Sequence, residues 1–264
     1  MLGDRVSAVA LPFLVLELGG SAVQLGQLAA VYSGAQLVLL LLGGVLADRF
    51  SRRSTMVFTD LLRGIILGLV VFLLVEKQLG MNYLFVMYLV FGLCSAFFMP
   101  ASASIMPEIV PKPSLVSANA LRSFAAEFCG IVGPAFAGIL IGFGGLALAL
   151  GFDAVSFFVG VVCLLAIQVT ARTGRASEER KGYWNEILQG FRLIGGSRWL
   201  WVTIVLFAFV NVFVAGATSV LFPLLAKERL GDVKTLGWLF SGLAAGSLLG
   251  ALVLGRLGKI WRHI

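Results

Sequence analysis

The sequence predicts an all-α integral membrane protein, and three observations support this fold class. First, 59% of its 264 residues are hydrophobic and only 12% are charged, against roughly 45–50% and 25% in soluble domains. Second, apolar runs of the length needed to cross a bilayer, about 20 residues, recur along the chain. Third, these runs are too long and alternate too poorly for barrel strands, and a backbone in lipid must satisfy its own hydrogen bonds. A helical bundle is therefore expected.

The hydrophobic segments predict the helices in order. The first segment is partial and occupies residues 1–18, and the second, 22–46, ends on a dense cluster of Arg and Asp, "DRFSRR". The remaining segments lie at about 54–75, 82–106, 116–142, 144–168, 199–226 and 235–257. We expect each of these to cross the membrane.

The distribution of Lys and Arg predicts the orientation. If the chain enters from the cytosol, 13 basic residues fall in the connections and tail on that side, against four on the other. The 13 are Arg49, Arg52, Arg53, Lys112, Arg172, Arg175, Arg180, Lys181, Arg192, Arg198, Arg256, Lys259 and Arg262, and the four are Lys77, Lys227, Arg229 and Lys234. This asymmetry places the Arg-rich loops in the cytoplasm, with the protein in the cell membrane. It also explains the net charge of +7 without nucleic acid as a partner.

The composition gives no indication of an enzyme. Cys94, Cys129 and Cys163 lie inside apolar segments without metal-ligand spacing, so we interpret them as buried thiols. The sequence shows no paired His, nucleophile–base pair, metal cluster or phosphate loop, and its one histidine is His263. We therefore expect no catalytic residues, no cofactor and no metal. No signal peptide is expected either, because no basic leader precedes the first segment.

An internal repeat predicts two related halves. Sliding the sequence on itself by 211 residues superposes one proline, one glutamate and three glycines without a gap; these pairs are Pro12/Pro223, Glu17/Glu228, Gly20/Gly231, Gly26/Gly237 and Gly44/Gly255. The period spans six helices, and two six-helix halves are a known plan of transporters. We expect residues 1–168 to form a first half with a truncated first helix, 169–198 a cytosolic linker, and 199–264 helices seven and eight of a twelve-helix protein.

The linker carries an amphipathic pattern. Its apolar residues recur at helical spacing beside Glu186 and Arg192 and are Tyr183, Trp184, Ile187, Leu188, Phe191 and Ile194. This pattern predicts a helix that lies on the inner leaflet or one that caps the bundle.

The charged cluster after the second segment is specific enough to indicate a family. The stretch from Gly44 to Arg53, "GVLADRFSRR", resembles the loop between helices 2 and 3 of the major facilitator superfamily, with Ser51 where glycine is usual. The resemblance implies a major facilitator-type bundle in which Gly44, Asp48, Arg49, Arg52 and Arg53 form a gating loop that latches the halves on the cytosolic side. Independently, an Asp at a helix C-terminus is disfavoured by the helix dipole unless a cation or a helix N-terminus meets it. The alternative, plain topological anchoring, explains the arginines but not the aspartate.

Two further matches indicate a branch of exporters. Gly130, Gly133, Pro134 and Gly138 in the fifth segment resemble a Gly-Pro motif of exporters in this superfamily, although packing alone also explains such kinks. The connection from Pro100 to Arg122, "DRVSAVALPFLVLEL" in the first segment and "FDAVSFF" at 152–158 are similar to the macrolide and siderophore exporter branch.

Charges inside the hydrophobic segments are the proton-coupling candidates, since an ionised group at mid-bilayer costs roughly 2.5–3.5 kcal/mol. We nominate Asp4, Arg5 and Glu127, with Glu127 as a candidate partner for Arg5. Asp60 and Arg63 are three residues apart and are expected to pair with each other. Asp153 is expected to act as a structural hydrogen-bond acceptor.

The resemblance also nominates residues that face a substrate. In the family, helices 1, 4, 7 and 10 line the cavity, and on this sequence that points to Phe91, Phe97, Phe98, Met99, Phe207, Asn211 and Phe213. For each single aromatic residue, core or lipid packing is an alternative interpretation.

These patterns together predict a secondary transporter that works by alternating access. The resemblance implies proton-coupled efflux of a lipophilic small molecule such as a drug, a macrolide or a siderophore-like compound, by a protein that is monomeric when complete. Its expected partners are the small-molecule substrate, protons and the lipid bilayer. A solute importer or uniporter of the same fold, or a non-transporting membrane receptor, are the alternatives.

Overall fold

The computed structural model describes residues 1–47, 51–167, 198–216, 221–225, 242 and 246. Within these ranges every regular element is helical, which confirms the all-α fold class. The first six helices are α1 (Leu2–Glu17), α2 (Ala22–Ala47), α3 (Arg52–Val75), α4 (Met81–Ser104), the short α5 (Met106–Ile109) and the long α6 (Leu115–Ala166). A 3₁₀ turn, Lys112–Ser114, precedes α6, and α8 (Arg198–Gly216) and α9 (Phe222–Leu225) follow later in the chain.

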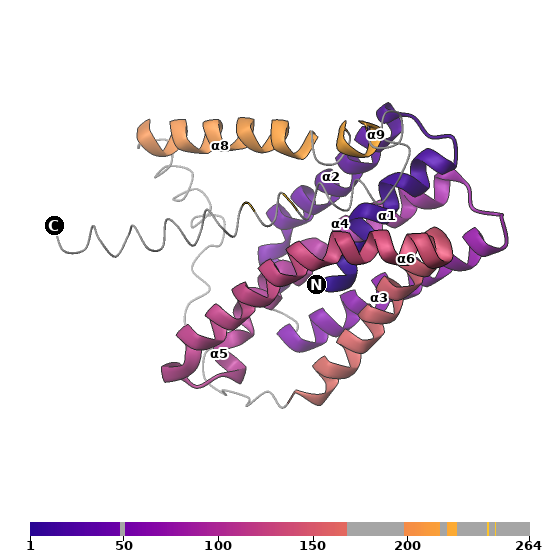
Figure 1. Cartoon of the computed structure of the whole chain (residues 1–264). Helices are drawn as coiled ribbons and strands as arrows, with labels where there is room; N and C mark the ends of the chain where they lie inside the picture. Colours follow the sequence, from indigo (N-terminus) through magenta and orange to yellow (C-terminus); the bar gives the residue numbers. More distant parts are fainter. Residues whose placement is uncertain (48–50, 168–197, 217–220, 226–241, 243–245, 247–264) are drawn as a thin grey trace.

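The long α6 consists of two helices that correspond to the predicted fifth and sixth segments. The backbone leaves helical geometry at Gly144 and at Gly145, where φ is +70°. Residues with a Cβ rarely adopt this left-handed region, so glycine allows the reversal. Figure 1 shows the second part of α6 turning back past α3. Two membrane crossings are thereby joined without a loop.

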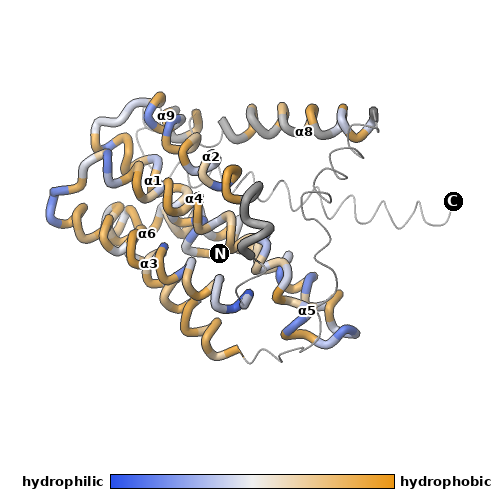
Figure 2. The backbone as a smooth tube through the Cα atoms, turned by 180° about the vertical axis from the view of Figure 1, so that it is seen from behind, coloured by the Kyte–Doolittle hydropathy of each residue, from blue (hydrophilic) through white to orange (hydrophobic). Residues whose placement is uncertain are grey.

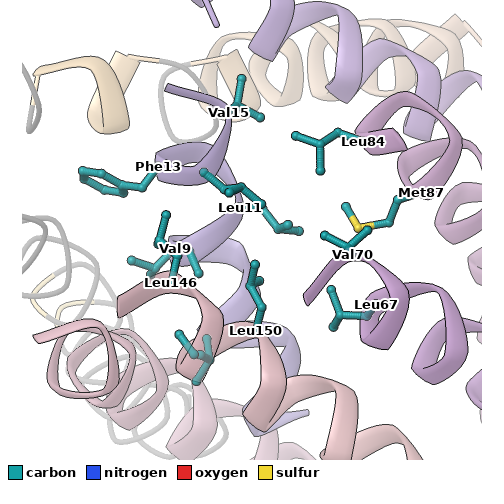
Figure 3. Close-up of a cluster of buried hydrophobic side chains, with 14 of the residues drawn as sticks. Val9, Leu11, Phe13, Val15, Leu67, Val70, Leu84, Met87, Leu146 and Leu150 are labelled. Carbon is teal, nitrogen blue, oxygen red and sulfur yellow. The ribbon is translucent and has the colours of Figure 1, made fainter. Parts of the chain in front are cut away.

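Helices α1 to α6 fold around a main buried core, and Met56, Ala101, Ile105 and Leu164 form a second, smaller hydrophobic cluster. Helix α1 packs against α6, α2 packs against α4, and α3 packs against both α4 and α6. Figure 3 shows the side chains that meet where α1, α3, α4 and α6 converge. Among them Leu14, Leu67, Leu84 and Leu150 are fully buried. Because the lipid is as apolar as these side chains, they stabilise the bundle through close van der Waals packing between helices.

The outer surface of the bundle is apolar, as expected of a membrane protein. Phe58, Phe72 and Phe143 are among the large hydrophobic side chains that point outward. Figure 2 shows hydrophobic residues along the lengths of the helices and hydrophilic ones gathered at their ends and loops. Within the described residues, four helical stretches are long and apolar enough to span a bilayer: Ala22–Leu39, Arg52–Val75, Met81–Ser104 and Lys112–Ala166. The protein is a multi-pass membrane protein.

Helix α8 corresponds to the predicted seventh segment and lies beside the bundle rather than within it (Figures 1 and 2). Its Trp199 and Trp201 side chains are exposed. The predicted linker, apart from Arg198, lies outside the described residues, and so does the predicted eighth helix except Gly242 and Gly246.

Candidate functional site

The gating-loop motif begins in α2 and continues at the start of α3. Gly44 lies in α2, whereas Asp48 and Arg49 are outside the described residues. Ser51, which replaces the usual glycine, is the N-cap of α3 and accepts a hydrogen bond from the backbone N–H of Ser54 at 3.1 Å. A serine cap satisfies one of the free N–H groups that begin every helix. The departure from the motif therefore adds a helix cap.

Arg52 joins the start of α3 to the end of α4. Its Nη1 donates to Glu108 Oε1 at 2.6 Å and to the backbone carbonyl of Ser104 at 2.8 Å. Glu108 belongs to α5, so one guanidinium holds three helices together. No local sequence pattern indicates this ion pair, because 56 residues separate its partners.

Arg53 caps the end of α6. Its Nε donates to the carbonyl of Leu164 at 2.7 Å, and its Nη2 donates to the carbonyl of Leu165. The last carbonyls of a helix lack partners within the helix and carry the negative end of its dipole. A cationic donor there both satisfies these carbonyls by hydrogen bonding and interacts favourably with the dipole. Arg53 has a structural role beyond charge on one side of the membrane.

The Gly-Pro motif lies at a close approach of α1 to α6. Gly133 and Pro134 are buried, and a Cβ placed on Gly133 would collide with Cβ of Arg5. Gly130, one turn earlier, has no such neighbour within 4 Å in the described part of the chain. A close contact with Arg5 of α1 is formed at Gly133 and, among the described residues, not at Gly130. Gly138, one turn later, is also buried.

The three proton-coupling candidates do not meet. The Asp4 carboxylate lies 2.7 Å from the amino group of Met1, and its side chain is 53% exposed. Arg5 and Glu127 are both exposed, and no ion pair joins them among the described residues. The expected pairing of Arg5 with Glu127 is therefore wrong for this conformation, because neither side chain is withdrawn from the surface.

The buried charges lie deeper, on α3. Asp60 and Arg63 are both 7% exposed, and Oδ1 of Asp60 lies 4.0 Å from Nη1 of Arg63. The predicted pairing is confirmed. Arg63 also donates from Nη2 to Ser95 Oγ on α4 at 3.0 Å, and its guanidinium lies 5.1 Å from the ring centre of Phe98. Such cation–π contacts are strongest away from water.

Asp153 is the most buried charged side chain in the described part of the chain, at 1% exposure. Ser7 Oγ on α1 donates to its Oδ2, and Ser156 Oγ donates to its Oδ1 at 3.1 Å. The expectation that Asp153 accepts hydrogen bonds is confirmed. A Cβ on Gly3 would collide with the same carboxylate, so α1 reaches Asp153 only because residue 3 is glycine.

The aromatic candidates divide between the core and the surface. Phe91 meets Phe157 edge to face at 6.0 Å between ring centres, and Phe98 covers Arg63. Both therefore pack inside the first half. Phe97 is half-buried and Met99 exposed. On α8, Phe207 and Phe213 are exposed, and the side chain of Asn211 lies outside the described residues.

A multi-pass helical bundle with charged side chains buried between its helices is an arrangement common in membrane transport proteins. The chain belongs to the Major Facilitator Superfamily, whose family model matches residues 1–264. This membership confirms the predicted resemblance and fold.

Curated relatives cover almost the whole chain. It is 30% identical to the multidrug efflux pump Tap of Mycolicibacterium fortuitum, over 95% of this chain and 62% of the relative. It is 28% identical to the enterobactin exporter EntS of Shigella boydii and 29% identical to that of Salmonella typhimurium, in both cases over 94% of this chain and 59% of the relative. The chain thus spans about three fifths of the length of these relatives.

Proposed function

We propose that this chain belongs to a secondary transporter that exports a lipophilic small molecule in exchange for protons by alternating access. The observation that carries the proposal is its similarity, along 94–95% of its length, to relatives named as a multidrug efflux pump and as enterobactin exporters. In this proposal residues 1–168 form the first half, 169–198 the cytosolic linker and 199–264 the beginning of the second half.

The cytosolic gate is proposed to depend on the loop that follows α2. Arg52 and Arg53 fasten the start of α3 to α4, α5 and α6, so the loop before them is attached to a rigid half. Asp48 is then available to meet a helix terminus or a cation of the other half, as its place after a helix C-terminus requires. Gly44 is proposed to permit close helix approach at the same end.

Proton coupling is proposed to involve Asp4, with Arg5 and Glu127 as the other candidates. Asp4 and Arg5 lie on α1, next to the tight contact of that helix with α6. A movement of α1 against α6 would therefore change the surroundings of both charges. Met99, Phe207, Asn211 and Phe213 remain proposals for the substrate surface, together with the half-buried Phe97.

Transport by proteoliposomes that contain the purified protein tests the proposal. With an imposed proton gradient, we expect uphill movement of ethidium, a macrolide or enterobactin, accompanied by proton movement in the opposite direction. Vesicles that contain Asp48→Asn protein should transport poorly although the variant inserts normally, whereas Asp48→Glu should retain part of the activity. Substrate movement in the same direction as the protons would contradict the proposed exporter and favour the alternative, a solute importer of the same fold.

The coupling residue is tested in the same vesicles. Asp4→Asn should abolish uphill transport while substrate binding, measured by fluorescence of the bound dye, survives. Uphill transport at the normal rate would remove Asp4 from the mechanism.

A further inference from the structure

Two groups of buried polar side chains in the first half, one around Arg63 and one around Asp153, are not used by the proposed gate and cavity. Asp60 and Arg63 come from α3, Asp153 from α6, Ser7 from α1 and Ser95 from α4. All five side chains are less than 9% exposed. A polar cluster at this depth in a membrane protein is costly to form, and such groups commonly serve a function.

The two groups differ in their balance of charge. Asp60 lies beside Arg63, at 4.0 Å, so these two charges compensate each other. Asp153 has no Lys, Arg or His side chain within 4.0 Å in the part of the chain that the structure describes. Its hydrogen-bond partners, Ser7 and Ser156, are neutral hydroxyls, which can accept a hydrogen bond from a carboxyl O–H as well as donate one to a carboxylate. If Asp153 were ionised, its negative charge would have no compensating cation beside it among the described residues.

The surroundings of Asp153 offer little to offset that charge. On α1, the ionisable groups that act on it are Asp4 and the amino group of Met1, which pair with each other. Asp60 of α3 lies beside Gly160 of α6, since a Cβ built on Gly160 would be 3.4 Å from its Oδ2. Gly160 is seven residues, or about 10 Å along the helix, from Asp153. Asp60 is therefore distant from Asp153. Arg63 faces Ser95 and Phe98 of α4, beside the thiol of Cys94, and its Nε has no hydrogen-bond partner. A second buried cation is not present within the described residues to neutralise Asp153.

An uncompensated carboxylate in such a place takes up a proton instead of remaining charged. We propose that Asp153 is a neutral carboxylic acid in this conformation and that its proton is one that the transporter exchanges. This inference rests on the proposed function and names a buried proton-binding group for it. On release, the carboxyl O–H bond breaks, the proton passes to water and the carboxylate keeps the electron pair.

The hydrogen bond to Ser7 connects this proton to helix movement. Ser7 and Gly3 lie on the face of α1 that contacts Asp153. If α1 moves relative to α6, the carboxyl loses its Ser7 partner and the Gly3 backbone no longer covers it. Water then reaches the carboxyl group, and hydration stabilises its ionised form. Proton release thus accompanies separation of α1 from α6.

Infrared spectroscopy of the purified protein in lipid tests the proposal without measuring transport. We expect a protonated-carboxyl C=O band that disappears in Asp153→Asn. The band should weaken as the pH is raised. Persistence of the band in Asp153→Asn, or its absence from the unaltered protein, would overturn the proposal.

Ser7→Ala provides a second variant in case Asp153→Asn does not fold. It keeps the carboxyl and removes one hydrogen-bond partner, so the band should shift in frequency; an unchanged band would contradict the assignment to Asp153. Proton movement in proteoliposomes gives the independent measurement. If the unaltered protein moves ethidium, the macrolide or enterobactin without protons, the coupling in the proposed function fails, whereas the infrared result alone decides whether Asp153 is neutral.

Discussion

At the scale of single residues, the two adjacent arginines of the gating loop make different kinds of contact. Arg52 makes an ion pair with one carboxylate oxygen and a hydrogen bond to one carbonyl, both from the same nitrogen. Arg53 uses two different nitrogens to reach two successive carbonyls at the end of α6. A compact ammonium can replace the first arrangement but not the second, because only the planar guanidinium has donors in a fixed fork.

We therefore predict that Arg53→Lys destabilises the protein more than Arg52→Lys does. Losing one hydrogen bond from a charged donor costs about 1.5–3 kcal/mol, and the half-exposed position of Arg53 places the expected loss near the lower value. The lysine at position 52 still reaches Glu108, so that loss should be small. Thermal unfolding in detergent measures both variants. If both variants were destabilised equally, the positive charge of Arg53, and not its two hydrogen bonds, would account for its role.

At the scale of elements, the contact between α1 and α6 determines how the first half is assembled. Gly133 and Gly3 lie on opposite sides of it, and each faces an atom that a methyl group would strike. Helices in membranes approach closely where small residues line the interface, since dispersion contacts then replace the hydrophobic effect.

Gly133→Ala should force α1 away from α6. We expect a destabilisation of about 1–3 kcal/mol, which is typical of overpacking, measured by denaturant unfolding in detergent. Gly130→Ala is the matched control one turn away, where nothing lies within 4 Å among the described residues. It should be neutral or slightly stabilising, by up to about 1 kcal/mol, because alanine favours helix more than glycine does. If Gly133→Ala were as stable as the control, α1 could move away from α6 without loss of stability, and the tight contact would not be needed.

Sequence patterns predict the helices and the local Asp60–Arg63 pair, but not the contacts between residues that are far apart in the chain. Hydrophobic runs indicate the helices because the bilayer sets their length, and the spacing of Asp60 and Arg63 indicates their pairing because residues three apart share a helix face. The bond from Ser7 to Asp153 spans 146 residues and that from Arg53 to Leu164 spans 111. Such contacts depend on which helices become neighbours, and no local pattern encodes that. Phe91 and Phe98 illustrate the same limit, since their type suits a cavity as well as a core.

At the scale of the whole molecule, the direction in which the chain crosses the membrane remains a prediction from its charges. Helix α3 offers a direct test because it is a single span of 24 residues, about 36 Å long, with Ser51 before its first turn and Gly80 in the loop after its last. The two positions must therefore lie on opposite sides of the bilayer.

We predict that Ser51→Cys is labelled by a membrane-impermeant maleimide only from the cytosol and Gly80→Cys only from outside. The measurement needs a background in which Cys94, Cys129 and Cys163 are replaced by alanine. The interpretation of all three as buried thiols is wrong for Cys163, which is exposed at the surface of the bundle. Gly174→Cys, in the predicted linker, should behave as Ser51→Cys does, since the basic residues around it favour the cytosol. The opposite pattern would reverse the orientation and move Arg52, Arg53 and the proposed gate to the outer face. Labelling of positions 51 and 80 from one side would contradict α3 as a single membrane crossing.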